Sequence, residues 1–109
     1  MLPNASQAVV DPSKVRDYLL SSSHPIGGFK SVVFLALGYT RSEWVRLRDD
    51  LLTVALSGTA ELGEENQFGR KYMVSGTLRG PNGREGVIRT VWLIENAQSA
   101  PRFLTAYPE

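Results

Sequence analysis

The chain has 109 residues, enough for one hydrophobic core and too few for two, so we expect a single domain over residues 1–109. Hydrophobic residues make up 42% of it, yet no apolar run approaches the roughly 18 residues that a membrane-spanning helix needs, and the first residues lack the charged and apolar regions of a secretory signal. Cysteine is absent, which excludes disulfides and thiolate metal sites. The absence fits a cytoplasmic protein, and it equally fits a domain that must unfold, cross a membrane and refold.

The net charge of +1 conceals an uneven distribution. Residues 1–66 carry six Lys/Arg and eight Asp/Glu, whereas residues 67–109 carry six and three, so the two parts sum to −2 and +3. Surfaces that bind phosphate are usually basic. The second part is therefore the expected anion-facing part, the alternative being that its charges form an ordinary solvated surface.

Two helices are predicted before residue 39. Asp11-Pro12 is typical of a helix start, because proline fits the first helical position, and the serines at 21–23 end this helix. The second helix begins between Pro25 and Phe29 and ends at Gly38. Its expected buried stripe has helical spacing and consists of Phe29, Val32, Val33, Ala36 and Leu37.

A third helix has the strongest local signal in the chain. Thr40-Arg-Ser-Glu43 has the pattern of a capping box, and Tyr39 and Trp44 occupy the two positions of a hydrophobic staple. Gly58 ends this helix. Its expected buried face consists of Trp44, Leu47, Leu51 and Ala55, which we interpret as scaffold.

After the third helix the pattern changes to strands. Residues 70–79 and 85–95 are rich in β-branched and aromatic residues and flank the turn Gly80-Pro-Asn-Gly83, which predicts an antiparallel hairpin. Residues 102–107 add a further strand. Weaker strand candidates are residues 60–65 and 8–10. The expected fold is α+β, with about three N-terminal helices packed on a C-terminal antiparallel sheet of three to five strands.

The last predicted strand carries a mixed set of side chains. Because side chains alternate along a strand, Phe103, Thr105 and Tyr107 are expected on one face. The other face would then hold Arg102, Leu104 and Ala106. Such mixing indicates either a polar site on the sheet surface or an edge strand with a polar end.

His24 is the one side chain whose ordinary pKa lies near neutral pH. It precedes the predicted second helix, whose free amides favour an anion, and Lys30 follows one to two turns later. The pair fits a phosphate site in which His24 donates a proton and Lys30 stabilises charge. The alternative is a loop histidine that caps the helix, beside a solvated lysine.

The polar pair Arg89-Thr90 interrupts the apolar run of residues 85–95. An arginine on a mostly apolar sheet face either extends to water or binds an acidic group. Lys71 and Tyr72 open the preceding strand and are expected near the same end of the sheet. Arg89 is thus a candidate for phosphate stabilisation and the other three residues for substrate binding, although each also fits an ordinary structural role.

Several chemistries are excluded. One histidine without cysteine cannot build a common zinc site, and the pairs Asp49-Asp50 and Glu64-Glu65 match no metal-binding motif, so neither a metal nor another cofactor is expected. The chain also lacks a phosphate-binding glycine loop and a nucleophile elbow. Metal-free chemistry with a histidine, basic residues and hydroxyls remains, and cleavage of RNA through its own 2′-hydroxyl is the best-known reaction of this kind.

A series of motifs covers nearly the whole chain in order: Leu2-Pro-Asn-Ala, Tyr18-Leu-Leu, His24-Pro-x-Gly-x-x-Lys30, Leu37-Gly-Tyr-Thr40, Lys71-Tyr, Gly80-Pro-Asn-Gly83, Arg89-Thr-Val-Trp92 and Leu104-Thr-Ala-Tyr-Pro108. They resemble a bacterial and phage domain family without assigned function, whose members occur alone or at the carboxyl ends of large secreted toxins. The order of helices before sheet and the Thr-x-Tyr near the end are similar to barnase/EndoU/RelE-like ribonuclease toxins. EndoU enzymes use a second histidine, which this chain does not have.

The resemblance implies a toxin-like, metal-independent ribonuclease. His24 would be the general acid or base, Lys30 and Arg89 would stabilise the phosphorane, and Thr105 and Tyr107 would position the phosphate. RNA would be the substrate and an immunity or antitoxin protein the partner, with no membrane partner. The place of action would be the cytoplasm, reached in relatives by delivery into a target cell as part of a larger toxin. The alternative is a non-catalytic binding or immunity-type accessory protein of a toxin locus.

Overall fold

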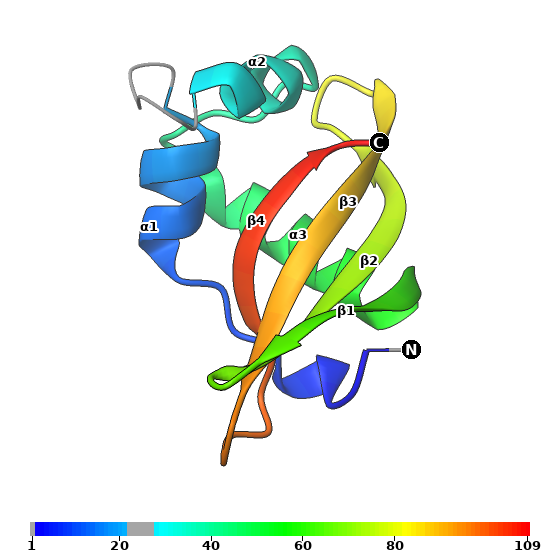
Figure 1. The fold of residues 1–109 in the computed structure, drawn as a ribbon. Coiled ribbons are helices and arrows are strands. Elements are labelled where there is room, and N and C mark those ends of the chain that lie inside the picture. Colours follow the sequence, from blue (N-terminus) through cyan, green and yellow to red (C-terminus); the bar gives the residue numbers. More distant parts are fainter. Residues whose placement is uncertain (1, 22–27) are drawn as a thin grey trace.

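The computed structural model describes residues 2–21 and 28–109, with the backbone alone for residues 28–30. Helical elements come first and strands follow, which confirms the predicted α+β class (Figure 1). In chain order the elements are η1 (Ala5–Gln7), α1 (Pro12–Lys14), η2 (Val15–Leu19), α2 (Gly28–Ala36), α3 (Trp44–Ser57), β1 (Thr59–Asn66), β2 (Gly69–Arg79), β3 (Glu85–Glu95) and β4 (Arg102–Pro108).

The four strands form one antiparallel sheet in the order β1-β2-β3-β4. The predicted turn at residues 80–83 joins β2 to β3, and Gly83 has a φ of 86°, which glycine adopts without strain. The weaker strand prediction at residues 60–65 is confirmed by β1. Near residues 8–10, Val9 forms a parallel bridge to Arg102, so this segment lies beside the start of β4.

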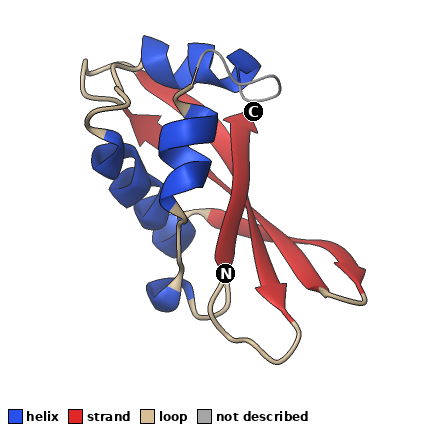
Figure 2. Cartoon of the chain, turned by 90° about the vertical axis from the view of Figure 1, so that its left-hand side faces the viewer, coloured by secondary structure: helices blue, strands red, loops and turns tan. Residues whose placement is uncertain are grey.

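The helices cover one face of the sheet (Figures 1 and 2). α3 contacts β2 and β3, while α1 and α2 contact β4. Within the described ranges, no helix covers the opposite face, which we call the open face. The strand residues buried against the helices are Val74, Leu78, Ile88, Thr90, Trp92, Phe103 and Ala106.

The first helical segment begins as predicted. The Oδ1 of Asp11 accepts the backbone N–H of Ser13 at 2.9 Å, which caps α1. The segment then widens into the π-helix η2, in which the N–H of Leu20 donates to the carbonyl of Val15 at 3.0 Å. It ends at Leu19, before the serines that were predicted to end it, and it buries Val15 and Leu19 in the core.

The residues buried along α2 and just after it agree only in part with the predicted stripe, of which Leu37 is confirmed. Ser31, Phe34 and Leu37 are buried, whereas Val32 is 67% exposed and Ala36 is also exposed. The predicted stripe included Phe29 but not Phe34. Burial of an aromatic ring removes more apolar area from water than burial of a valine, and the helix is rotated so that Phe34 enters the core.

α3 begins at Trp44, about one turn later than predicted. The Oγ1 of Thr40 accepts the N–H of Glu43 at 3.3 Å, as in a capping box, but residues 41–43 form a turn instead of an α-helix. Trp44 is half-buried, with the guanidinium of Arg48 at 5.4 Å from its ring centre. The rest of the predicted buried face, Leu47, Leu51 and Ala55, is confirmed.

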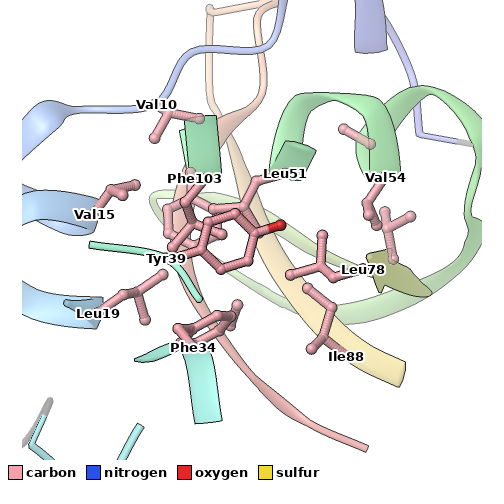
Figure 3. Close-up of a cluster of buried hydrophobic side chains, with 14 of the residues drawn as sticks. Val10, Val15, Leu19, Phe34, Tyr39, Leu51, Val54, Leu78, Ile88 and Phe103 are labelled. Carbon is pink, nitrogen blue, oxygen red and sulfur yellow. The ribbon is translucent and has the colours of Figure 1, made fainter. Parts of the chain in front are cut away.

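Tyr39, between α2 and α3, lies inside the cluster of buried side chains (Figure 3). Its ring is 1% exposed, and its hydroxyl donates to the Oδ2 of Asp50 at 2.5 Å. Burial, and then this hydrogen bond, raise the pKa of Tyr39 well above its usual range. The ring therefore holds the connection before α3 against α3 itself.

A β-bulge in β4 changes the faces predicted for the last strand. Phe103 pairs with Trp92, and the register resumes at Thr105 after the extra residue Leu104. Phe103 lies in the core, edge-on to the Trp92 ring with 5.3 Å between centroids, whereas Thr105 and Tyr107 lie on the open face. The prediction that Phe103 shares their face is wrong, because strict alternation fails at a bulge.

Asp17 joins η2 to the segment before α3. Its carboxylate accepts hydrogen bonds from Arg16 and Arg41, each at 2.9 Å, and these bonds lower the pKa of Asp17 to about 2. The unfolded value is about 3.9. The interaction thus stabilises the fold fully above pH about 4, and this stabilisation is lost as the pH falls towards 2.

We expect Asp17→Asn to flatten the pH dependence of the free energy of unfolding between about pH 4 and pH 2. Arg41→Gln should act in the same direction, since it removes one of the two donors. Urea unfolding at a series of pH values measures both effects. If the free energy of unfolding of Asp17→Asn depended on pH as steeply as that of the wild type, this assignment would be contradicted.

Candidate functional site

One row of side chains crosses the open face from strand to strand. Thr59, Ser75, Arg89 and Tyr107 are register partners on β1, β2, β3 and β4. Opposite residues in antiparallel strands present their side chains on the same face. The row, which we call the Arg89 row, therefore places three hydroxyl-bearing side chains on one line with a guanidinium.

Two carboxylates beside the row, those of Glu109 and Glu61, hold Arg89. Its side chain is 27% exposed, and its Nη2 donates to the Oε1 of Glu109 at 2.8 Å and lies 3.9 Å from the Oε1 of Glu61. The hydrogen bond to Glu109 is the largest of the effects that raise the pKa of Arg89 above its ordinary value. Of the two alternatives for this arginine, binding to an acidic group is the one observed, and its permanent charge suits it to hold anions.

Tyr107 and Thr105 lie beside Arg89 on the open face. Tyr107 is 36% exposed and is the direct partner of Arg89. Thr105 is half-buried, and its Oγ1 lies 3.5 Å from the hydroxyl of Tyr18 in η2. Three of the predicted catalytic residues thus share one face within two register positions of one another.

Thr90 lies on the other side of the sheet. It is fully buried, and its hydroxyl donates to the carbonyl of Val74 and accepts the indole N–H of Trp92, both at 2.7 Å. These bonds satisfy the hydroxyl inside the core. The substrate contact predicted for Thr90 does not fit this position, because the Thr90 side chain points into the core while that of Arg89 lies on the open face.

Lys71 and Tyr72 are also separated from the Arg89 row. Tyr72 pairs with Trp92 and packs against the core. Lys71 lies on the open face, but it is four residues along β2 from Ser75, about 13 Å at the usual rise of a strand. Only Lys71 can meet a ligand that extends along this face from Arg89.

His24 lies outside the described residues, and Lys30 is described only by its backbone within α2. Their roles stay predictions. α2 contacts β4, the strand that carries Thr105 and Tyr107.

Glu61, Ser75 and Glu109 belong to the observed site and were not predicted. Glu109 continues the period-two series of Thr105 and Tyr107, so alternation along the last strand was a usable signal. Glu61 and Ser75 come next to Arg89 only through the register of neighbouring strands. Sequence alone does not supply that register.

A groove of about 440 Å³ lies between α3 and the edge of β2. β1 begins at Thr59, opposite Ser75, so no strand of the described chain pairs with residues 76–79 on this side. Thr53 and Ser57 line the helix wall. The groove thus exposes a short sheet edge in polar surroundings.

Among the residues that the structure describes, no three His, Asp or Glu side chains gather as ligands of a metal ion would. Over the same residues, no helix combines the length and the apolar character that crossing a bilayer requires. The chemical groups of the observed site are a guanidinium, hydroxyls and carboxylates.

A protein-family model matches the chain over residues 1–109. The chain belongs to DUF6883, a domain family of unknown function. Among solved structures, a chain of the contact-dependent growth inhibition toxin–immunity protein complex from Klebsiella pneumoniae 342 is similar to this DUF6883 domain, with a TM-score of 0.73 and 20% identity. The similarity covers 94% of this chain and 100% of that chain, and at this identity it shows a shared fold. No curated protein matches the chain.

Proposed function

We propose that this DUF6883 domain is a metal-independent ribonuclease of the toxin type. The observation that carries the proposal is the Arg89 row, in which a charged guanidinium and hydroxyls lie on a sheet face open to solvent. The guanidinium fork matches the geometry of a phosphate, and hydroxyls add donors to its oxygens. An RNA strand laid across this face would place a phosphodiester at Arg89.

The reaction needs two proton transfers and the stabilisation of added negative charge. A base removes the proton of the ribose 2′-hydroxyl, the 2′-oxygen bonds to phosphorus, and the bond between phosphorus and the 5′-oxygen breaks. An acid gives a proton to the departing 5′-oxygen. The products are a 2′,3′-cyclic phosphate and a 5′-hydroxyl, and no further reactant enters the balance.

Arg89 stabilises the charge of the phosphorane, and Tyr107 and Thr105 direct their hydroxyls at its oxygens. Charge stabilisation of this kind is usually the largest single contribution to the rate enhancement by an enzyme. Lys71, further along the open face, binds another phosphate further along the same strand. The substrate thus runs along the sheet away from the Arg89 row.

His24 acts as the acid and Lys30 adds positive charge, as the sequence pattern indicates. Glu61 acts as the base, a role for which the sequence offered no residue. Its carboxylate lies 3.9 Å from the Nη2 of Arg89, close enough to a phosphate bound there to reach the adjacent 2′-hydroxyl.

The fold shared with a chain of a toxin–immunity protein complex supports a toxin-locus origin. We therefore expect a cognate immunity protein as the partner and the cytoplasm of a target cell as the place of action. An immunity protein would protect the producing cell by covering the open face.

A second candidate function, a non-catalytic binding module of immunity type, is favoured by the groove beside β2. The edge of residues 76–79 that faces away from β3 suits an added strand from a partner protein, because a sheet edge offers main-chain donors and acceptors to any extended segment. In this case the contacts of Arg89 with Glu61 and Glu109 are structural ion pairs.

Incubation of the purified protein with RNA and with DNA of the same sequence separates the two functions. We expect cleavage of RNA that leaves 2′,3′-cyclic phosphate ends and persists in chelator, and no cleavage of DNA, which has no 2′-hydroxyl. Arg89→Ala should lower the rate by about 10²–10³-fold, the usual loss for one preorganised charge-stabilising donor.

Arg84→Ala is the matched control, since Arg84 is an exposed arginine in the turn between β2 and β3 and should keep the wild-type rate. Thermal unfolding of both variants checks that the fold survives. Equal cleavage of DNA would contradict the 2′-hydroxyl mechanism, and no cleavage of RNA would favour the binding module.

A further inference from the structure

The carboxylate of Glu109 occupies the anion-binding position of the Arg89 row. Its Oε1 accepts hydrogen bonds from the Nη2 of Arg89 at 2.8 Å and from the hydroxyl of Ser75 at 3.2 Å. The two donors come from neighbouring strands and converge on one oxygen. A built anion site is thus present on the open face, and it holds a carboxylate of the chain itself.

This internal ligand uses only part of the arginine. The Nε of Arg89 is buried and has no hydrogen-bond partner among the described residues. Such an atom is costly, because a buried donor normally finds an acceptor. A phosphate, whose oxygens can accept from Nη2 and Nε together, would satisfy both donors where one oxygen of Glu109 satisfies one.

The side chain of Glu109 can leave without disturbing the sheet. Its backbone N–H donates to the carbonyl of Val87 at 3.0 Å, so the main chain stays fixed beside β3. The side chain is 37% exposed, and rotation about its own bonds takes it into solvent. Exchange of the carboxylate for another anion is therefore a local step.

We propose that Glu109 is an internal competitor for the phosphate subsite formed by Arg89 and Ser75, and that a phosphodiester binds there by displacing it. This inference rests on the proposed function for its substrate, while the site itself is defined by the contacts of Glu109. The domain carries its own weak inhibitor, and the affinity for RNA is set partly by how readily this side chain moves away.

Removal of the competitor should strengthen phosphate binding by a modest factor. The pair is partly exposed, and exposed ion pairs are weak, so Glu109→Gln and Glu109→Ala should bind inorganic phosphate about 2- to 5-fold more tightly than the wild type. Glu64→Gln is the matched control, since it removes one exposed carboxylate from β1 and leaves the Arg89 contacts intact. It should bind phosphate as the wild type does.

Titration with inorganic phosphate, followed by NMR at the Arg89 side-chain N–H and the amides of Ser75 and Tyr107, measures this difference. Equal phosphate affinities in Glu109→Gln and Glu64→Gln would overturn the proposal. Chemical-shift changes on phosphate addition that do not include Arg89, or no binding in any variant, would overturn it as well. Because this experiment involves no cleavage, a domain that binds phosphate competitively but leaves RNA intact would refute the ribonuclease alone.

A second titration with a short single-stranded RNA separates the two sources of phosphate. The same gain in the Glu109 variants is expected if the natural ligand is a phosphodiester. A gain for inorganic phosphate without one for RNA would assign the subsite to a small anion and overturn the phosphodiester part of the proposal.

Discussion

Replacing Trp92 with alanine is expected to lower the free energy of unfolding by about 3–5 kcal/mol. Trp92 is fully buried in β3 and lies edge-on to Phe103, with 70° between the ring planes. Its indole N–H also donates to Thr90 at 2.7 Å. The substitution leaves a cavity between the sheet and the helices and removes a donor from a buried hydroxyl.

Urea unfolding followed by circular dichroism measures this loss. Val87→Ala is the matched control, because Val87 lies on the same strand but is 50% exposed on the open face, and it should stay within about 0.5 kcal/mol of the wild type. A loss below about 1 kcal/mol in Trp92→Ala would show that the helices do not pack on this face of the sheet.

Elements with a complete local signal were predicted closely. The turn at residues 80–83 combines two glycines, a proline and an asparagine between two strand-like runs, and it joins β2 to β3 where expected. Asp11-Pro12 likewise marks the start of α1. In both cases the residues that decide the structure are neighbours in sequence.

Predictions that depended on tertiary packing were less accurate. The buried residues of α2 differ from the predicted stripe because Phe34 enters the core. Helical spacing alone does not show which of several apolar stripes faces the sheet. The bulge at Leu104 puts Phe103 on the opposite face from Thr105, because one extra residue shifts the alternation of side chains by one. The position of such a bulge depends on the pairing with β3. Neither event leaves a local mark in the sequence.

The candidate site was predictable in part. Alternation along a strand places Arg89 and Thr90 on opposite faces, but it does not say which face the helices cover, so both were candidates. Once the core side is known, Thr90 is a buried hydroxyl and Arg89 a surface guanidinium. The contacts with Glu61 and Glu109 then follow from register and from the path of the chain after Tyr107.

In the ribonuclease mechanism, the largest kinetic effect is expected from His24→Ala. A histidine that gives a proton to the departing 5′-oxygen contributes about 10²–10⁴-fold to the rate, so its loss should lower kcat by that factor. Binding of phosphate at Arg89 and Ser75 should be unchanged, because the variant leaves both donors in place. Single-turnover cleavage of RNA measures the loss of rate, and the phosphate titration measures the binding.

Addition of imidazole distinguishes proton transfer from a structural role of His24. Imidazole can supply the missing proton donor to the departing oxygen, so it should restore part of the rate in His24→Ala in proportion to its protonated fraction. It should not restore Arg89→Ala, in which the missing group stabilises charge and carries no transferable proton at neutral pH. Wild-type kcat in His24→Ala, or equal rescue of both variants, would show that His24 is not the acid of this reaction.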